Sequence, residues 1–165
     1  ELLLGRQPLA NYSFALTFCS AQRQPLFIHQ GTATAVVDAM YRSARDGYCT
    51  QLAFVVMPDH VHWLVTLTGK CSLAALVAAT KRAATRRLQQ TCGVALPIWQ
   101  SGYYEHRVRA DEDLRRQARY LVANPIRAGL VQRVTDYPYW FALRAPPPHG
   151  PSEFVDGVDR ILDPW

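Results

Sequence analysis

The pattern of apolar and polar positions in the first half of the chain predicts three strands and one helix. Apolar and aromatic runs at 12–19 and 49–57 are bounded by turn residues, as buried strands are. Residues 60–67 alternate in polarity and follow a Pro-Asp pair that supplies a tight turn, so the later two strands are expected to form a hairpin. Apolar residues at helical spacing predict a helix over 32–46.

The second half of the chain predicts two more helices and a short strand. A helix is expected over 72–90, begun by a serine N-cap and stopped by a glycine. A short strand within 99–108 precedes a helix over 111–123, which Pro125 forces to end. This order predicts an α+β fold, a ferredoxin-like split βαβ core with an antiparallel sheet, to which a C-terminal helix bearing Tyr120 is added.

Composition narrows the class of protein. One domain is expected over 1–144 of the 165 residues, followed by a Pro-rich tail at 145–165. The net charge of +5 comes mostly from arginine, which pairs with phosphate in a bidentate way, although a merely soluble basic protein would carry the same charge. The four cysteines contain no CxxC pair, which argues against a zinc knuckle and favours a reducing, cytoplasmic setting.

Two histidines stand two residues apart at the start of the predicted strand 60–67. Side chains at i and i+2 of a strand point to the same face, so His60 and His62 are expected side by side, as half of a metal site. The opposite face carries Val61, Trp63 and Val65, which can pack into a core. A purely structural histidine pair is the alternative, but a position at the end of a sheet suits a ligand better.

Tyr120 is the candidate nucleophile on the predicted helix 111–123. At 100° per residue the apolar positions of that helix gather on one side, and Tyr120 points the other way, among polar neighbours. Asn124 lies one turn on, so its amide oxygen could complete a metal site begun by the two histidines. A phenol, with its ordinary pKa of about 10, needs such a metal or another cation to act at neutral pH. An amphipathic surface tyrosine is the plainer alternative.

Two segments resemble a known family. MPDHVHWLV at 57–65 resembles the HUH strand of the IS200-type single-tyrosine transposases, and WQSGYYEHRVRADEDLRRQARYLVANPIRAGLV at 99–131 resembles their tyrosine-helix region. The stretch RYLVANPIRAGLV is most similar to the branch called REP-associated tyrosine transposases. Matched residue by residue, His60 and His62 correspond to the HUH pair and Tyr120 to the nucleophile. Asn124 stands where the wider family often has a glutamine.

The resemblance implies an activity as well as a fold. We expect a metal-dependent endonuclease and strand transferase that cuts single-stranded DNA at hairpin-forming repeats through a covalent 5′-phosphotyrosine. Mg²⁺ or Mn²⁺ would be held by His60, His62 and Asn124. The protein is expected to be a monomer with no membrane partner, cytoplasmic and associated with the nucleoid.

Further residues are candidates for contact with DNA. Basic side chains could bind phosphates and tyrosines could stack on bases, with a solvated basic face as the alternative for each arginine. His106 is a possible ligand or phosphate contact, or simply a paired strand residue. The candidates are Lys81, Arg82, Arg86, Tyr103, Tyr104, His106 and Arg127.

Two other functions are alternatives to nicking. A non-catalytic DNA-binding protein could descend from the same fold, and only a cleavage assay would separate it from the enzyme. An RNA-binding ferredoxin-like module would need the aromatic strand motifs of an RRM, which the strands at 12–19 and 49–57 do not carry.

Overall fold

The computed structural model describes residues 10–109 and 111–143, and its secondary structure follows the predicted order. The elements are β1 (Ser13–Cys19), η1 (Ala21–Arg23), α1 (Gln30–Arg45), β2 (Cys49–Val56), β3 (His60–Leu67), α2 (Leu73–Cys92), β4 (Tyr104–Val108), α3 (Asp111–Val122), α4 (Asn124–Arg127), η2 (Val134–Asp136) and β5 (Trp140–Ala142).

The described strands form one antiparallel sheet in the order β4-β1-β3-β2-β5. The first four strands have the order expected of a ferredoxin-like split βαβ core, so the predicted fold class is confirmed. β3 lies in the middle of the sheet and pairs with both β1 and β2. A central strand is held on both edges, and β3 therefore gives its side chains a rigid base.

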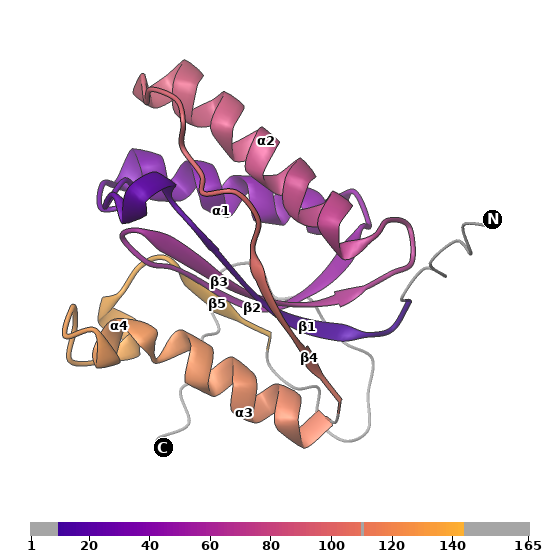
Figure 1. Ribbon diagram of the computed structural model, residues 1–165. Coiled ribbons are helices and arrows are strands. Elements are labelled where there is room, and N and C mark those ends of the chain that lie inside the picture. The colour runs from indigo at the N-terminus through magenta and orange to yellow at the C-terminus, as the bar shows by residue number, and fades with distance from the viewer. Residues whose placement is uncertain (1–9, 110, 144–165) are drawn as a thin grey trace, which may run out of the picture.

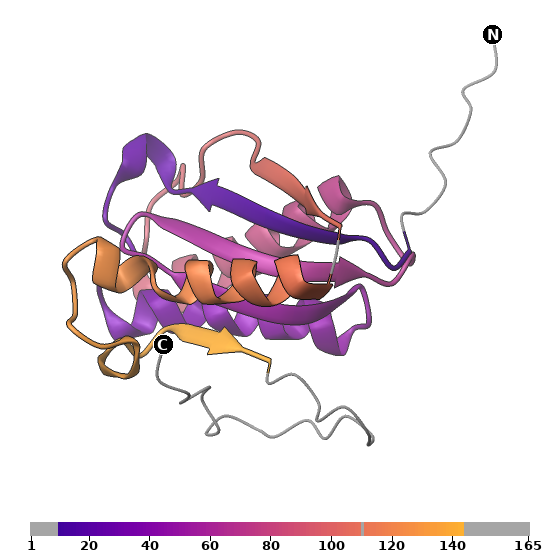
Figure 2. The same ribbon diagram turned by 90° about the horizontal axis from the view of Figure 1, so that it is seen from below.

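Helices cover both faces of the sheet (Figure 1). α1 and α2 lie on one face, and α3 lies across β2 and β3 on the other, as the view from below also shows (Figure 2). The alternation of β3 places Val61, Trp63 and Val65 fully buried beneath α1 and α2, as predicted. Leu64 belongs to the smaller core beneath α3, which puts His60 and His62 on the α3 face as well.

Local sequence signals fix the ends of α2. The Ser72 side chain accepts a hydrogen bond from the backbone N–H of Ala75 at 3.2 Å, the N-cap interaction that the sequence predicts. Gly93 ends the helix at φ +64°, a left-handed conformation that glycine adopts without a steric penalty. One stripe of α2 is buried as expected: Leu73, Leu76, Val77, Ala84 and Leu88.

The turn between β2 and β3 is held from two sides. Within the hairpin, the N–H of Met57 donates to the carbonyl of His60 at 2.8 Å. From the segment between β1 and α1, the N–H of Ser20 donates to the carbonyl of Asp59 at 2.9 Å. The N–H of Phe27 donates to the carbonyl of Pro58 at 2.8 Å. The connection from β1 to α1 therefore clamps the loop that presents the two histidines.

The short strand predicted within 99–108 is β4: Tyr104–Val108 pairs with β1, while Trp99 forms an isolated bridge to Ser20. Two further elements, β5 and α4, were not predicted. β5 was not predicted, since three residues show no periodicity; it forms by pairing with β2. α3 ends at Val122, close to the predicted end, and α4 begins directly after it at Asn124, with Pro125 in its first turn. The predicted Pro-rich tail at 145–165 lies outside the described residues.

Candidate active site

The imidazole rings of His60 and His62 meet edge to face on the α3 side of β3. Their Nε2 atoms lie 3.1 Å apart and the ring centroids 4.7 Å apart. A separation of this size is what two nitrogen ligands of one metal ion require, given metal–nitrogen bonds of about 2.0–2.1 Å. The pair predicted from the i, i+2 spacing is therefore formed, with the two Nε2 atoms side by side.

The other nitrogen of each ring is bound by a neighbouring side chain. Asp59 accepts a hydrogen bond from His60 Nδ1 at 2.5 Å, and Thr17 Oγ1 lies 2.8 Å from His62 Nδ1. Such partners fix the orientation and tautomer of metal-binding histidines and leave the Nε2 lone pairs for the metal. This donor set fits a divalent ion with open positions. Within 10–109 and 111–143 no third His, Cys, Asp or Glu side chain joins the pair to make a metal-binding group, so the two imidazoles would leave the other coordination positions open.

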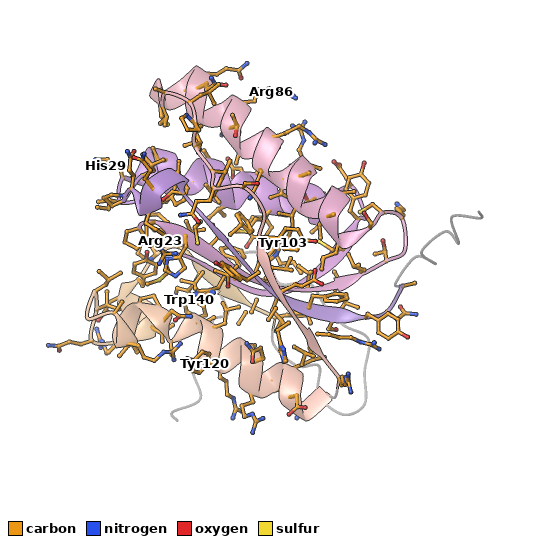
Figure 3. The ribbon with its side chains drawn as sticks, in the orientation of Figure 1. Arg23, His29, Arg86, Tyr103, Tyr120 and Trp140 are labelled. Carbon is orange, nitrogen blue, oxygen red and sulfur yellow. The ribbon has the colours of Figure 1, made fainter. Side chains whose placement is uncertain are left out.

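Arg23 supports Asp59 from an unusual backbone conformation. Its Nε lies 2.9 Å from Asp59 Oδ2, and its guanidinium also donates to Cys19 Sγ at 2.8 Å. Gln22 and Arg23 both have left-handed φ values, 53° and 56°, which cost a non-glycine residue about 1 kcal/mol each. The strained turn brings Arg23, labelled in Figure 3, to Asp59, the residue that binds His60.

Charge and burial keep His62 neutral. Burial, His60 and the positive charges of Arg127 and Arg23 lower the pKa of His62 from 6.5 to about 4, with Asp59 acting in the opposite direction. The neutral imidazole is the form that ligates a metal. Two guanidinium groups close enough to act on His62 also make the surroundings favourable for an anion such as a phosphodiester.

A cavity of about 210 Å³ joins His62 to Tyr120 within one chain. Tyr120 is 59% exposed, while Leu121 and Val122 are buried, so α3 turns the phenol away from the core as predicted. The cavity opens between β1, β3, β4 and α3, and its lining consists of Ala15, Leu16, Thr17, His62, Tyr104, Glu105, His106, Gln117, Tyr120 and Leu121. A hollow of about 1260 Å³ around α1 is larger, but no predicted catalytic residue lines it.

Arg127 lies over the ring of Tyr120. Its guanidinium carbon is 3.7 Å from the ring centroid, and its NH2 group donates to the backbone carbonyl of Tyr120. The sequence singled out Arg127 only as a phosphate contact. The structure places it against the candidate nucleophile and within electrostatic reach of His62.

Asn124 caps the end of α3. Its Nδ2 donates to the carbonyl of Leu121 at 2.8 Å, and Asn124 is absent from the lining of the cavity that holds Tyr120. Gln117, one turn before Tyr120, is the amide that lines this cavity. The role of Asn124 as a metal ligand stays a prediction.

The predicted DNA contacts divide between the two faces of the sheet. Tyr104, 72% exposed, and His106 line the cavity with Tyr120, whereas Tyr103 packs partly buried against the core under α1 and α2. Arg82 and Arg86 are exposed on α2, across the sheet from Tyr120, where Figure 3 labels Arg86.

Lys81 on the same helix has a structural task. Its Nζ donates to the carbonyls of Gln100 at 3.0 Å and Gly102 at 2.6 Å, and burial lowers its pKa. This ammonium ties α2 to the segment that leads into β4. Contact between Lys81 and DNA remains a prediction.

Four site residues escaped the sequence analysis for different reasons. Asp59 directly precedes His60, and a carboxylate next to a ligand histidine is a signal that could have been used. Gln117 lies three residues before Tyr120 on the same stripe of α3. Thr17 and Arg23 could not be found, because one depends on the register of β1 against β3 and the other on a left-handed turn.

A ferredoxin-like sheet with a histidine pair on its central strand and a tyrosine on the helix opposite defines a recognisable class of α+β protein. The chain matches the family described as IS200-like transposases over residues 9–124, and it belongs to that family. The resemblance drawn from the motifs at 57–65 and 99–131 is thereby confirmed.

Individual relatives agree with this family. The chain is 32% identical over 114 residues to a Haemophilus influenzae protein named as a REP-associated tyrosine transposase, covering 60% of this chain and 65% of that protein. It is 33% identical over 88 residues to the REP-associated tyrosine transposase of Escherichia coli K12. That match covers 53% of this chain and 50% of the Escherichia coli protein. The chain thus spans less than two thirds of these curated relatives.

Solved structures share the fold. A REP-associated tyrosine transposase bound to a REP hairpin has a TM-score of 0.65 and 25% identity, covering 85% of this chain and 82% of that one. A Deinococcus radiodurans protein described as a transposase has a TM-score of 0.53 and 22% identity. That match covers 74% of this chain and 97% of the Deinococcus radiodurans chain. In residues 10–109 and 111–143 no helix is long and apolar enough to cross a membrane.

Proposed function

We propose that this protein is a metal-dependent endonuclease and strand transferase that acts on single-stranded DNA beside hairpin-forming repeats. The observation that carries the proposal is the cavity in which His62 and Tyr120 face the same space in one chain. The repeat hairpin as substrate is supported by the structural relative that is bound to a REP hairpin.

The chemistry follows from the side chains around that cavity. Tyr120 would attack the phosphorus of a phosphodiester, forming a bond from its phenolic oxygen to the 5′ phosphate while the bond to the 3′ oxygen breaks. The phenolic proton passes to solvent and the leaving oxygen takes up a proton, giving a free 3′ hydroxyl. Attack by a 3′ hydroxyl on the phosphotyrosine reverses these steps and rejoins DNA.

His60 and His62 would hold the divalent ion through their Nε2 atoms, with Asp59 and Thr17 keeping the rings in place. When bound, Mg²⁺ or Mn²⁺ supplies Lewis acidity to a non-bridging phosphate oxygen. Arg23 and Arg127 add positive charge beside the same position, and the exposed ring of Tyr104 is placed to stack on an unpaired base.

Covalent trapping tests the proposal. A labelled hairpin oligonucleotide with a single-stranded flank is incubated with protein and Mn²⁺, and denaturing gels report a protein–DNA adduct. Tyr120→Phe keeps the ring and removes the oxygen, so it should bind the hairpin with near-normal affinity and form no adduct. Tyr104→Phe is the matched control, because Tyr104 lines the same cavity.

The outcomes separate the candidate functions. An adduct that persists in Tyr120→Phe and disappears in Tyr104→Phe would mean that Tyr104 is the nucleophile. Tight hairpin binding by the wild type with no adduct and no nick would favour a non-catalytic DNA-binding protein. Excess EDTA and the variant His62→Ala are each expected to abolish the adduct, and full activity in chelator would exclude the metal requirement.

A further inference from the structure

The segment NPIRAG at 124–129 builds a tight turn after α3, and most of its residues have a structural task. Asn124 caps the Leu121 carbonyl through its side chain. Pro125 is buried in the first turn of α4. Gly129 has φ +70°, which disfavours a residue with a β-carbon. The N–H of Ala128 donates to the carbonyl of Asn124 at 2.9 Å.

Arg127 is the polar side chain of this turn that folds back toward the helix. Although it is seven residues after Tyr120, it makes two contacts with that residue: the guanidinium lies 3.7 Å above the ring centroid, and NH2 donates to the Tyr120 carbonyl. The hydrogen bond and the ring contact together hold the guanidinium over the Tyr120 ring. Arg127 is itself exposed, so burial of its own side chain does not account for the arrangement.

Resting on the proposed function, we infer that Arg127 is a positioning residue for the nucleophile: its guanidinium stacks on the Tyr120 ring and holds the phenol toward the cavity that contains His62. An exposed tyrosine can otherwise sample several rotamers, and each unproductive rotamer reduces the rate of in-line attack. Cation–π contact and a backbone hydrogen bond together restrict that freedom. Lysine cannot supply both contacts, because it lacks the planar fork of donors.

The position of the turn suits this task. The guanidinium of Arg127 lies over Tyr120, which lines the same cavity as His62, so its positive charge is held next to the nucleophile. The same charge attracts the phosphodiester once the phenol is in place. The turn at 124–129 therefore places a positive charge beside the nucleophile of α3.

The experiment separates rate from affinity. Single-turnover adduct formation is measured at saturating labelled hairpin oligonucleotide, alongside the Kd, for wild type, Arg127→Gln, Arg127→Lys and the charge-matched control Arg116→Gln. Arg116 is exposed on α3 and pairs with Asp113 at 3.3 Å, outside the lining of the cavity. Arg127→Gln should lower the rate of adduct formation at saturating DNA by about tenfold. Arg127→Lys should recover only part of that rate, and Arg116→Gln should keep the wild-type rate.

A spectroscopic measurement tests the stacking without DNA. In NMR spectra of the wild type, the Arg127 side-chain protons should carry a ring-current shift that survives in Tyr120→Phe and is lost in Tyr120→Leu. Absence of that shift, an unchanged saturated rate in Arg127→Gln, or full rescue by lysine would each overturn the inference. Failure of the proposed function would look different, because the wild type would then form no adduct, or the adduct would persist in Tyr120→Phe whatever stands at 127.

Discussion

At the scale of single residues, the histidine pair depends on neighbouring side chains that hold the two imidazole rings in place. His60 has its Nδ1 bound to Asp59, and Asp59 is in turn held by Arg23 at 2.9 Å. His62 has its Nδ1 against Thr17. The Nε2 atoms are thereby kept 3.1 Å apart, and the site is preorganised to the extent that these outer contacts hold.

Replacing Asp59 should weaken metal binding more than it weakens the fold. Asp59→Asn keeps the size of the side chain but removes the charge that orients His60, so the affinity for Mn²⁺ should fall about 10- to 100-fold. Electron paramagnetic resonance of free Mn²⁺ during titration measures this affinity directly. Asp38→Asn is the control, because Asp38 pairs with Arg87 away from the site. Equal affinities in the two variants would contradict the role of Asp59.

At the scale of elements, the strand β2 is anchored close to the site by the segment that follows α4. The hydroxyl of Tyr137 donates to the carbonyl of Val56 at 2.6 Å, one residue before the loop that carries Asp59 and His60. The N–H of Val56 donates to the carbonyl of Tyr139 at 2.9 Å. This C-terminal segment therefore fixes the end of β2 as β5 fixes its middle.

Tyr137 should make stability depend on pH at the alkaline end. Burial raises the pKa of Tyr137 from 10 to about 12. Because the folded-state pKa is the higher one, the contribution is complete below pH 10 and is lost as the pH rises toward 12. Tyr137→Phe should cost about 1–2 kcal/mol at neutral pH, since it leaves a buried carbonyl without its donor.

Urea unfolding at several pH values checks this prediction. A range from about pH 8 to about pH 12 extends two units on either side of the ordinary tyrosine pKa of about 10. The free energy of unfolding should fall less steeply with pH in Tyr137→Phe than in the wild type. Burial also raises the pKa of Cys49 to about 12. Because Cys49 is present in both proteins, it does not change the difference between their pH dependences of unfolding free energy. Identical slopes would show that Tyr137 ionises equally in the folded and unfolded chains.

At the scale of the whole molecule, the sheet separates two basic regions. The candidate active site lies on the α3 face, whereas Arg82 and Arg86 are exposed on α2 on the other face (Figures 1 and 3). A contact of α2 with DNA would therefore involve a part of the substrate distant from the cut phosphodiester.

The double variant Arg82→Gln/Arg86→Gln should change affinity and not chemistry. If both arginines contact phosphates, hairpin binding weakens and the slope of log K against log salt falls by about 1 for each lost contact. The saturated rate of adduct formation should stay at the wild-type value. Filter binding across a salt series measures the affinity and its salt dependence, and single-turnover kinetics at saturating DNA measure the rate. An unchanged slope would mean that Arg82 and Arg86 do not contact the DNA.

The cavity shared by His62 and Tyr120 also predicts that one chain is sufficient for activity. A mixture of His62→Ala and Tyr120→Phe should not regain adduct formation, because each chain lacks one half of its own site. Light scattering should give the mass of a monomer at low micromolar concentration. Restored activity in the mixture would mean that two chains exchange their tyrosine helices.

Much of this arrangement could be predicted from local sequence because its causes are local. The i, i+2 spacing of His60 and His62 fixes their common face in any strand, and helical periodicity alone turns Tyr120 away from Leu121 and Val122. The cap and stop of α2 at Ser72 and Gly93 are likewise properties of single turns. For these features the predicted and observed structures agree.

Other features depended on partners distant in sequence. β5 has three residues and no periodicity of its own, so it exists as a strand only because β2 has a free edge to pair with. Thr17 reaches His62 through the register of β1 on β3, and Arg23 reaches Asp59 through two left-handed residues. The return of Arg127 over Tyr120 required the whole turn at 124–129. Sequence thus determined which face each chemical group occupies, whereas tertiary structure decided which groups meet, because long-range pairing and backbone strain leave no periodic signal.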